Sequence, residues 1–250
     1  MNLLRPLKPL KQPGARRGAL HVNATLVRFN TADGIRLDGV MVGTGTVGVG
    51  ARPRVRQRPV RRLPIRQLPG QGGLRVFAVD VRCLGRSACP QGDAAGRVVD
   101  DLVVAVAQLR QRGVTRVALV SASMGGSAAL IAATRVKPPV DPAVVLSGQA
   151  KPTSLLRVPL NFRGAVQQLT VPTMFVVANY DRYTSVDEPR AMYQTNKPAE
   201  TRLLVLPGQF DGFHGWMVLT NASGGFSSTT TKLRSRSSPP PTPRGRLANL

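Results

Sequence analysis

Acidic residues are scarce in this chain, which has 12 Asp and Glu against 35 Lys and Arg and a formal charge of +23 over 250 residues. Aromatic residues are also few, at 4%, so the base stacking that binds single-stranded nucleic acids has little support. Two Cys exclude a disulfide scaffold, and two His without a carboxylate cluster beside them argue against a catalytic metal. We therefore expect neither a cofactor nor a metal.

Long apolar runs are absent as well. The longest uncharged window, residues 117–134, is interrupted by serines and glycines, so no membrane span is expected. No apolar run of signal-peptide length follows the basic residues at the start of the chain, and we therefore expect a cytoplasmic location. Nothing in the sequence indicates an oligomeric state.

The positive charge is concentrated outside the central part of the chain. Residues 76–211 hold 15 basic and 10 acidic residues, a net charge of +5, whereas residues 1–75 carry +13. Residues 51–73 contain seven Arg and four Pro but no acidic residue. Such a segment can bind phosphates without sequence specificity, but we interpret it as a solvated charge run. No specific nucleic-acid partner is therefore expected.

Three segments have a composition unlike that of a folded domain. They are the basic residues 1–23, the Arg- and Pro-rich residues 50–73, and the Ser-, Thr- and Pro-rich residues 220–250. Proline at these spacings blocks both helices and central strands. We expect a domain at 24–219 that is interrupted at 50–73, with a flexible segment before it and a disordered tail after it.

The rest of the chain alternates between strand and helix patterns. A turn at Asp33-Gly34 predicts a hairpin, and later apolar runs predict strands that alternate with helices. Strands rich in Val and Leu on both faces indicate a mostly parallel sheet with helices on both sides, an α/β fold. The predicted strands are 24–32, 35–42, 74–80, 116–120, 143–147, 172–178 and 202–206, and the predicted helices are 98–112, 125–136 and 186–195.

Ser123 is the candidate nucleophile. It stands in Ser-Ala-Ser-Met-Gly between a predicted strand and a predicted small-residue helix, which is the context that a nucleophile elbow requires. Such a turn accepts only small residues two places before and after its centre, and Ser121 and Gly125 satisfy this. The backbone N–H of Met124 would then be one oxyanion donor, while no second donor is recognisable.

A serine hydroxyl needs a general base, and the base needs an acid to orient it. His214 follows the last predicted strand, whereas its rival His21 precedes the first. Asp181 follows the strand before, and we expect it to be the acid. Two alternatives remain open: Asp211, three residues before the histidine, and Asp187, which we expect to begin a helix.

Four segments in this order resemble the α/β-hydrolase superfamily, in particular its small bacterial esterase-like members. VFAVDVRCLGRS resembles a D-x-R-G-x-G-x-S loop, with Asp80, Arg82, Gly85 and Ser87 matching and Cys83 in place of a glycine. The other three are ALVSASMGGSAA, VPTMFVVANYDRYTSVDEPRAMY and LLVLPGQFDGFHGW. The resemblance implies a single-domain α/β-hydrolase fold with a Ser-Asp-His order of catalytic residues. The segment between Ser147 and Val171 is too short for a large cap, so we expect an open site.

The pattern of the family is interrupted in two places. The strand that should follow the first hairpin starts at Thr46-Val47-Gly48-Val49 and then gives way to the Arg- and Pro-rich segment, so we expect one central strand to be lost. A last helix is missing after Thr220. We hypothesise that both stretches are translated out of the ancestral frame from GC-rich coding sequence, which the 29 Arg against 6 Lys would fit.

Two further patterns have a structural interpretation. Residues 43–48 fit G-x-G-x-x-G, but a Pro- and Arg-rich segment follows instead of a helix and the required acid, so a dinucleotide site is not expected. Cys83 and Cys89 lie in one loop, and we interpret them as free structural thiols.

The sequence therefore predicts a serine hydrolase that cleaves a carboxylic ester or related acyl compound, with a small-molecule substrate. The alternative is a catalytically impaired protein of the same fold that binds anions or nucleic acid incidentally through its basic segments.

Overall fold

A β-hairpin begins the main sheet of the computed structural model, which describes residues 5–6, 24–51, 73–93, 97–148, 162–195 and 200–208. Its strands β2 (Ala24–Asn30) and β3 (Arg36–Val42) are antiparallel, and the two-residue β1 (Arg5–Pro6) pairs with β2 at the sheet edge. The turn has φ 79° at Gly34, which glycine adopts without strain. The predicted hairpin is confirmed.

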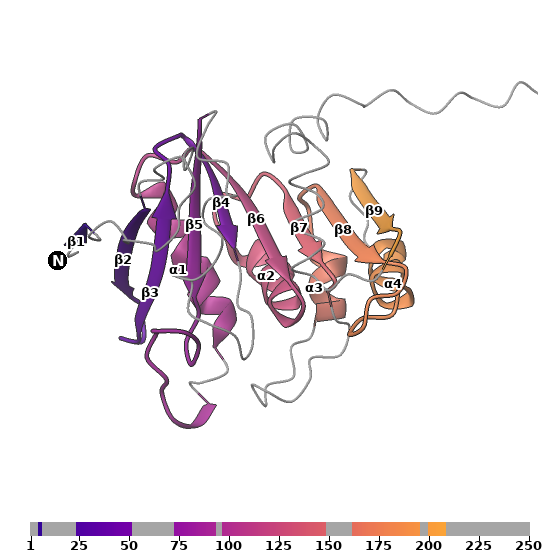
Figure 1. Cartoon of the computed structure of the whole chain (residues 1–250), viewed down its shortest axis with the longest axis horizontal. Helices are drawn as coiled ribbons and strands as arrows, with labels where there is room; N and C mark the ends of the chain where they lie inside the picture. The colour runs from indigo at the N-terminus through magenta and orange to yellow at the C-terminus, as the bar shows by residue number, and fades with distance from the viewer. Residues whose placement is uncertain are drawn as a thin grey trace, which may run out of the picture.

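The sheet has nine strands in the order β1-β2-β3-β5-β4-β6-β7-β8-β9, and the strands from β5 to β9 run parallel (Figure 1). Each predicted strand and helix from residue 74 onward is present, and the mostly parallel sheet is confirmed. These elements are β5 (Leu74–Asp80), α1 (Val98–Arg110), β6 (Arg116–Ala122), α2 (Met124–Arg135), β7 (Ala143–Leu146), β8 (Thr173–Ala178), α4 (Asp187–Thr195) and β9 (Thr201–Leu206), with the unpredicted α3 (Phe162–Gln168) between β7 and β8.

The central strand is kept, so the prediction that it is lost was wrong. β4 (Val47–Ala51) lies between β5 and β6 and is parallel to both, with Val49 opposite Val76 on one side and Ala118 on the other. Strand pairing uses backbone N–H and C=O groups, so five residues suffice to continue the sheet before Pro53. Residues 52–72 and 209–250, which include most of the anomalous segments, lie outside the described residues.

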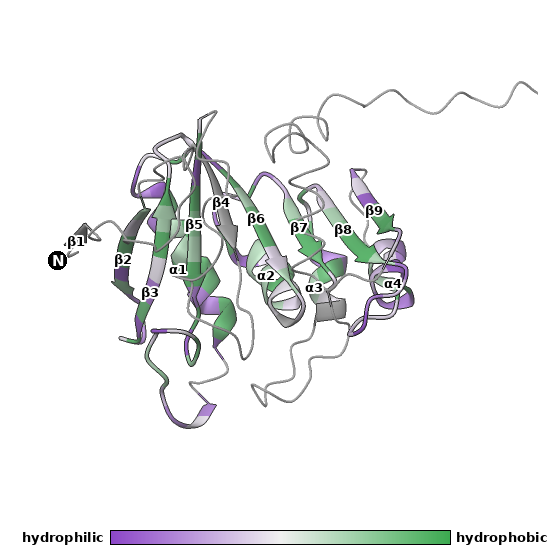
Figure 2. Ribbon diagram, viewed as in Figure 1, coloured by the Kyte–Doolittle hydropathy of each residue, from purple (hydrophilic) through white to green (hydrophobic). Residues whose placement is uncertain are grey.

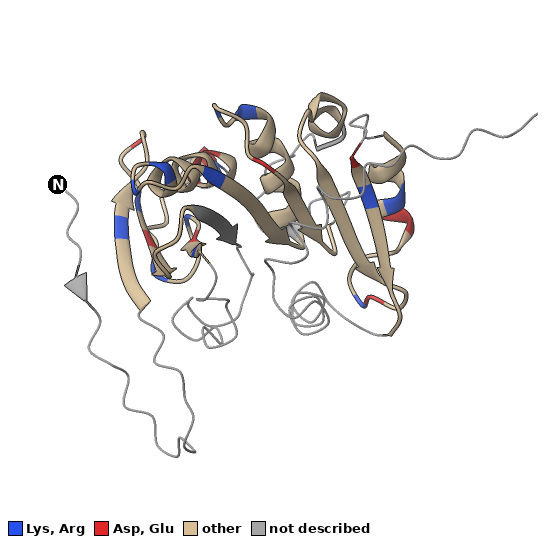
Figure 3. Ribbon diagram, turned by 90° about the horizontal axis from the view of Figure 1, so that it is seen from above, with Lys and Arg blue, Asp and Glu red and all other residues tan. Residues whose placement is uncertain are grey.

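The two faces of the sheet have different cores. One face carries alternate strand residues such as Phe77 and Phe175, which pack with apolar residues of all four described helices, including Leu102 on α1 and Met192 on α4. Figure 3 shows these helices together on one side of the sheet. The other face has a cluster made only of strand residues, among them Val120. The central strands are correspondingly apolar in Figure 2. Within the described residues, no helix is long and apolar enough to cross a membrane.

A disulfide joins Cys83 and Cys89, so our interpretation of these residues as free thiols was wrong. The loop after β5 folds back on itself, with Cys83 N–H donating to Ala88 O at 3.0 Å, and this brings the two sulfurs together. Sequence spacing alone did not show that the loop closes.

Candidate active site

Ser123 lies in a sharp turn between β6 and α2, as the elbow pattern predicts for its position. Its φ of 54° and ψ of −134° place it in a strained region for a residue with a side chain, at a cost of about 1–3 kcal/mol. Two backbone hydrogen bonds hold the turn: Ser123 N–H donates to Leu146 O at 2.9 Å, and Gly126 N–H donates to Ser123 O at 2.8 Å. The turn presents a partly exposed serine at the carboxyl end of a central strand.

Glycines allow the helix after Ser123 to approach the sheet. A Cβ at Gly126 would lie 2.6 Å from Val145 Cγ1, and one at Gly148 would lie 2.4 Å from the same atom. Neither distance is sterically possible unless the Val145 side chain or the nearby backbone shifts. Close packing of small residues therefore sets the position of the N-terminus of α2.

That helix begins at Met124. The first N–H groups of an α-helix have no partner within the helix, so the backbone N–H of Met124 is available to an anion next to Ser123. In the fold implied by the resemblance, the second oxyanion donor follows β4, and here residues 52–72 lie outside the described residues.

Asp181 follows β8 by three residues, two strands away from Ser123 in the sheet. Its Oδ1 accepts hydrogen bonds from Tyr183 N–H at 2.8 Å and Thr184 N–H at 3.1 Å. Its Oδ2 is buried and has no hydrogen-bond partner among the described residues. A buried carboxylate oxygen without a donor is costly, so this atom is suited to a partner that the described residues do not include.

The alternative acid Asp187 has a different environment. It begins α4, its side chain is 82% exposed, and it pairs with Arg190 at 2.8 Å within the same helix. It therefore acts as an N-terminal residue of α4. The other candidates, His214, His21 and Asp211, lie outside the described residues.

The loop after β5 carries the D-x-R-G-x-G-x-S motif, and the structure gives a physical reason for several of its residues. Gly85 has φ 57°, and a Cβ there would lie 2.0 Å from Asp80 Oδ2. Ser87 Oγ donates to Asp80 O and accepts from Asp38 N–H at 2.9 Å, which ties the loop to β3 and β5. Asp80, Gly85 and Ser87 thus build the loop.

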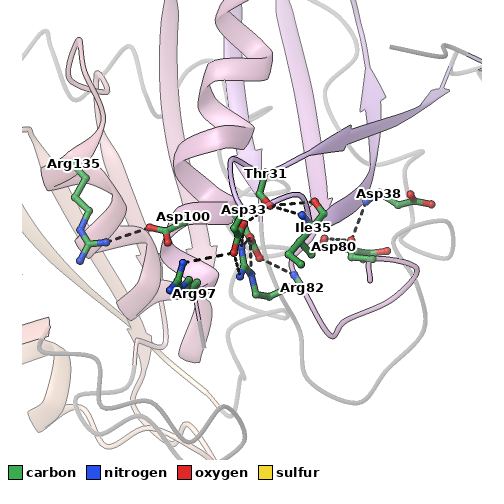
Figure 4. Close-up of polar contacts among 11 residues, drawn as sticks. Thr31, Asp33, Ile35, Asp38, Asp80, Arg82, Arg97, Asp100 and Arg135 are labelled. Atoms are coloured by element: carbon green, nitrogen blue, oxygen red, sulfur yellow. Dashed lines mark hydrogen bonds and ion pairs between the residues drawn. The ribbon is translucent and has the colours of Figure 1, made fainter. Parts of the chain in front are cut away.

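Arg82 of the same motif is the centre of a buried ionic network that we did not foresee (Figure 4). Its backbone N–H and guanidinium donate three hydrogen bonds of 2.7–2.9 Å to Asp101 on α1, and the guanidinium also bonds to Asp33 in the hairpin turn at 2.9 Å and 3.2 Å. The Arg82 guanidinium and the Thr31 hydroxyl lower the pKa of Asp33 to about 2. The network joins the hairpin turn, the loop after β5 and α1.

Comparisons with known proteins agree with this architecture. The sequence model of one family, described as serine aminopeptidase S33, matches residues 66–163, a stretch that contains Ser123 but not Asp181 or His214. No curated protein matches the chain significantly by sequence.

Solved structures of low sequence identity share the fold over most of the chain. An esterase of Pyrococcus furiosus, Pf2001, is 16% identical with a TM-score of 0.69, over 92% of this chain and 96% of that one. An acetyl xylan esterase from Paenibacillus sp. R4 is 15% identical with a TM-score of 0.66, over 90% and 89%. Est1E from Butyrivibrio proteoclasticus, with ferulic acid bound, is 15% identical with a TM-score of 0.59, over 76% and 93%.

The strand order, the strained serine between β6 and α2, the family match and these neighbours lead to one conclusion. The chain has the α/β-hydrolase fold, and its residues 66–163 match the serine aminopeptidase S33 family model.

Proposed function

We propose that the protein is a serine hydrolase that cleaves a carboxylic ester or a related acyl compound. Ser123 is the nucleophile, His214 the general base and Asp181 the acid that orients it. The observation that carries the proposal is the strained backbone of Ser123 at the start of α2, because a fold retains such strain where the surrounding structure requires it and often where function uses it.

In the proposed reaction, Ser123 Oγ attacks the acyl carbon while His214 takes the hydroxyl proton. The Met124 N–H, at the N-terminus of α2, stabilises the oxyanion that forms. The tetrahedral intermediate collapses, the C–O bond to the alcohol breaks, and the histidine returns the proton to the leaving oxygen. Water then attacks the acyl-enzyme in the same way and releases the carboxylic acid.

The position of the residues that follow β9 supports His214 as the base. Asn179 N–H donates to Leu206 O at 2.8 Å, and Tyr180 N–H donates to Gly208 O at 3.2 Å, so Gly208 lies beside the residue that precedes Asp181. Five residues lie between Gly208 and His214, and the six Cα–Cα steps between them can span up to about 20 Å. A histidine on this segment can therefore reach the unpartnered Oδ2 of Asp181.

The names of the neighbours support an ester as substrate, since they are an esterase, an acetyl xylan esterase and an enzyme with ferulic acid bound. The segment between β7 and α3 spans residues 147–161, which is too short for a large cap domain. We therefore propose a small acyl substrate that enters an open site.

A fluorophosphonate probe tests the proposal. It should label the purified full chain at Ser123, and the chain should hydrolyse short p-nitrophenyl esters. Both signals should disappear in Ser123→Ala, which removes only the hydroxyl. Hydrolysis that survives in Ser123→Ala would exclude Ser123 as the nucleophile.

The alternative of an impaired protein that binds anions depended on a broken sheet, and β4 removes that argument. Many described arginines are also paired with carboxylates, such as Arg28 with Asp38 at 3.0 Å and Arg116 with Asp141 at 2.9 Å. In Figure 3 the Lys and Arg residues of the described part of the chain lie at separate places on the ribbon rather than in one stripe. These features support a small-molecule substrate over a nucleic acid.

A cytoplasmic location stays a prediction from the sequence. The Cys83–Cys89 disulfide argues against it, because the thiol pools of the cytosol keep most protein cysteines reduced.

A further inference from the structure

The carboxyl end of β7 lies between the turn of Ser123 and the loop of Asp181, and it bonds to both. Leu146 O accepts from Ser123 N–H at 2.9 Å. The next residue, Ser147, donates its N–H to Val176 O of β8 at 2.7 Å, and its carbonyl accepts from the Thr184 hydroxyl at 3.1 Å. Successive peptide groups of β7 thus connect the candidate nucleophile on one side with the acid loop on the other.

Thr184 completes this connection because it makes two hydrogen bonds with different partners. Its N–H donates to Asp181 Oδ1 at 3.1 Å, while its hydroxyl donates to Ser147 O. The residue is 2% exposed, so water cannot replace either bond. Together with Tyr183 N–H, it holds Oδ1 and so sets the direction in which the free Oδ2 points.

The acceptor on β7 is itself firmly held. Ser147 is 5% exposed and has φ 48°, a left-handed backbone conformation that is uncommon for a residue with a side chain. Gly148 follows it in a space without room for a side chain, since a Cβ there would lie 2.4 Å from Val145 Cγ1. Because Gly148 is tightly packed and follows Ser147 directly, the peptide group between them, which carries the Ser147 carbonyl, has little freedom to rotate. The Ser147 carbonyl is therefore a rigid acceptor that holds the loop of Asp181 through the Thr184 hydroxyl.

We propose that Thr184 is a positioning residue of the active site, whose hydroxyl fixes the Asp181 carboxylate relative to Ser123 through the carbonyl of Ser147. This inference rests on the proposed hydrolase function. The hydroxyl does not touch the substrate; it acts by keeping Oδ2 where His214 must meet it. Loss of the hydroxyl should lower the rate of the chemical step and leave substrate binding unchanged.

The test compares Thr184→Val, which keeps the shape but not the hydroxyl, with Thr184→Ser, which keeps the hydroxyl. The matched control is Thr173→Val. Thr173 is also buried, at 1% exposed, and its hydroxyl donates to Val171 O at 3.0 Å, but it lies at the opposite end of β8. Both valine variants lose one buried threonine–carbonyl hydrogen bond, and only one of them lies at the site.

Kinetics of p-nitrophenyl acetate hydrolysis and thermal melting are measured on all three variants of the full chain. We expect both valine variants to melt a few degrees lower, at about 2–4 °C for each lost bond. Thr184→Val alone should lose about tenfold to a hundredfold in kcat, with KM unchanged, because sub-ångström misplacement of reacting groups has effects of this order. Thr184→Ser should keep the wild-type kcat.

The outcomes separate the two proposals. An active wild type whose Thr184→Val variant keeps the kcat of Thr173→Val would overturn the role of Thr184 and leave the hydrolase function standing. The same holds if Thr184→Ser loses as much kcat as Thr184→Val. A wild type that neither hydrolyses the ester nor reacts with the fluorophosphonate probe would overturn the hydrolase function, and the role of Thr184 with it.

Discussion

The Arg82 guanidinium donates two hydrogen bonds to Asp101 Oδ1, at 2.7 Å and 2.9 Å, and both side chains are completely buried. The Arg82 N–H donates a third bond, to Oδ2. An ion pair taken fully out of water is stable only when its hydrogen bonds are satisfied, and here Asp33 supplies the remaining acceptors (Figure 4). The pair joins α1 to the loop after β5.

Replacement of Asp101 by Asn should therefore destabilise the fold strongly. The change removes the fully buried one of the two carboxylates that pair with the Arg82 guanidinium, and we expect the free energy of unfolding to fall by about 3–5 kcal/mol. Asp100→Asn is the matched control, because Asp100 lies in the same turn of α1 and pairs with Arg135 at 3.4 Å with both side chains about half exposed. This control should lose less than about 1 kcal/mol in urea titrations. Equal losses would contradict a structural role for the buried pair.

Asp33 should make the stability of the protein depend on pH. Its pKa falls from an ordinary value of 3.8 to about 2 in the folded chain, because Arg82 and Thr31 donate hydrogen bonds to the carboxylate. A lowered folded-state pKa contributes stability that is fully present above the unfolded value and is lost as the pH falls toward 2. We expect wild type to be more stable than Asp33→Asn at pH 7. Urea titrations at a series of pH values should show this difference shrinking below about pH 4, and a difference that stays constant down to pH 3 would contradict the assignment.

The disulfide should stabilise the loop after β5. It closes a loop with a sequence separation of 6, for which chain entropy predicts about 2 kcal/mol. Cys83 has φ 63°, a conformation that glycine adopts more readily, and the resemblance indicates a glycine at this position. The double variant Cys83→Gly/Cys89→Ala should therefore recover about 1 kcal/mol relative to Cys83→Ala/Cys89→Ala. Melting curves of both variants, beside reduced wild type, measure the two contributions. Identical curves for the two double variants would exclude strain at Cys83.

Local patterns predicted most of the fold, and long-range contacts account for what was missed. β5 and β8 are short, mostly apolar runs, and α1 repeats apolar residues on one face, so each could be recognised from its own segment. α3 has only seven residues, one of them Gly164, and carries too weak a periodic pattern. β4 was underestimated because prolines follow it, although its pairing needs only five backbone units.

In the candidate site, too, local features could be predicted from the sequence, whereas contacts between distant residues could not. Ser123 was recognisable because its strand, turn and helix are contiguous in the sequence. The bond between Arg82 and Asp101 joins residues 19 apart, and that between Thr184 and Ser147 joins residues 37 apart. Such pairs depend on how β5, β7 and β8 are placed in the sheet, and no spacing rule in the sequence marks them.

The strain at Ser123 predicts that the candidate nucleophile lowers the stability of the fold. Glycine adopts a φ of 54° without the Cβ clash, so Ser123→Gly should raise the free energy of unfolding by about 1 kcal/mol while abolishing hydrolysis. Ser123→Ala is the control, since it removes the hydroxyl but keeps the Cβ and therefore the strain. It should be inactive with stability close to that of wild type. Urea titrations of the three proteins measure this difference in the free energy of unfolding. If Ser123→Gly is no more stable than Ser123→Ala, the backbone at Ser123 does not store strain, and the turn keeps its geometry without a cost in stability.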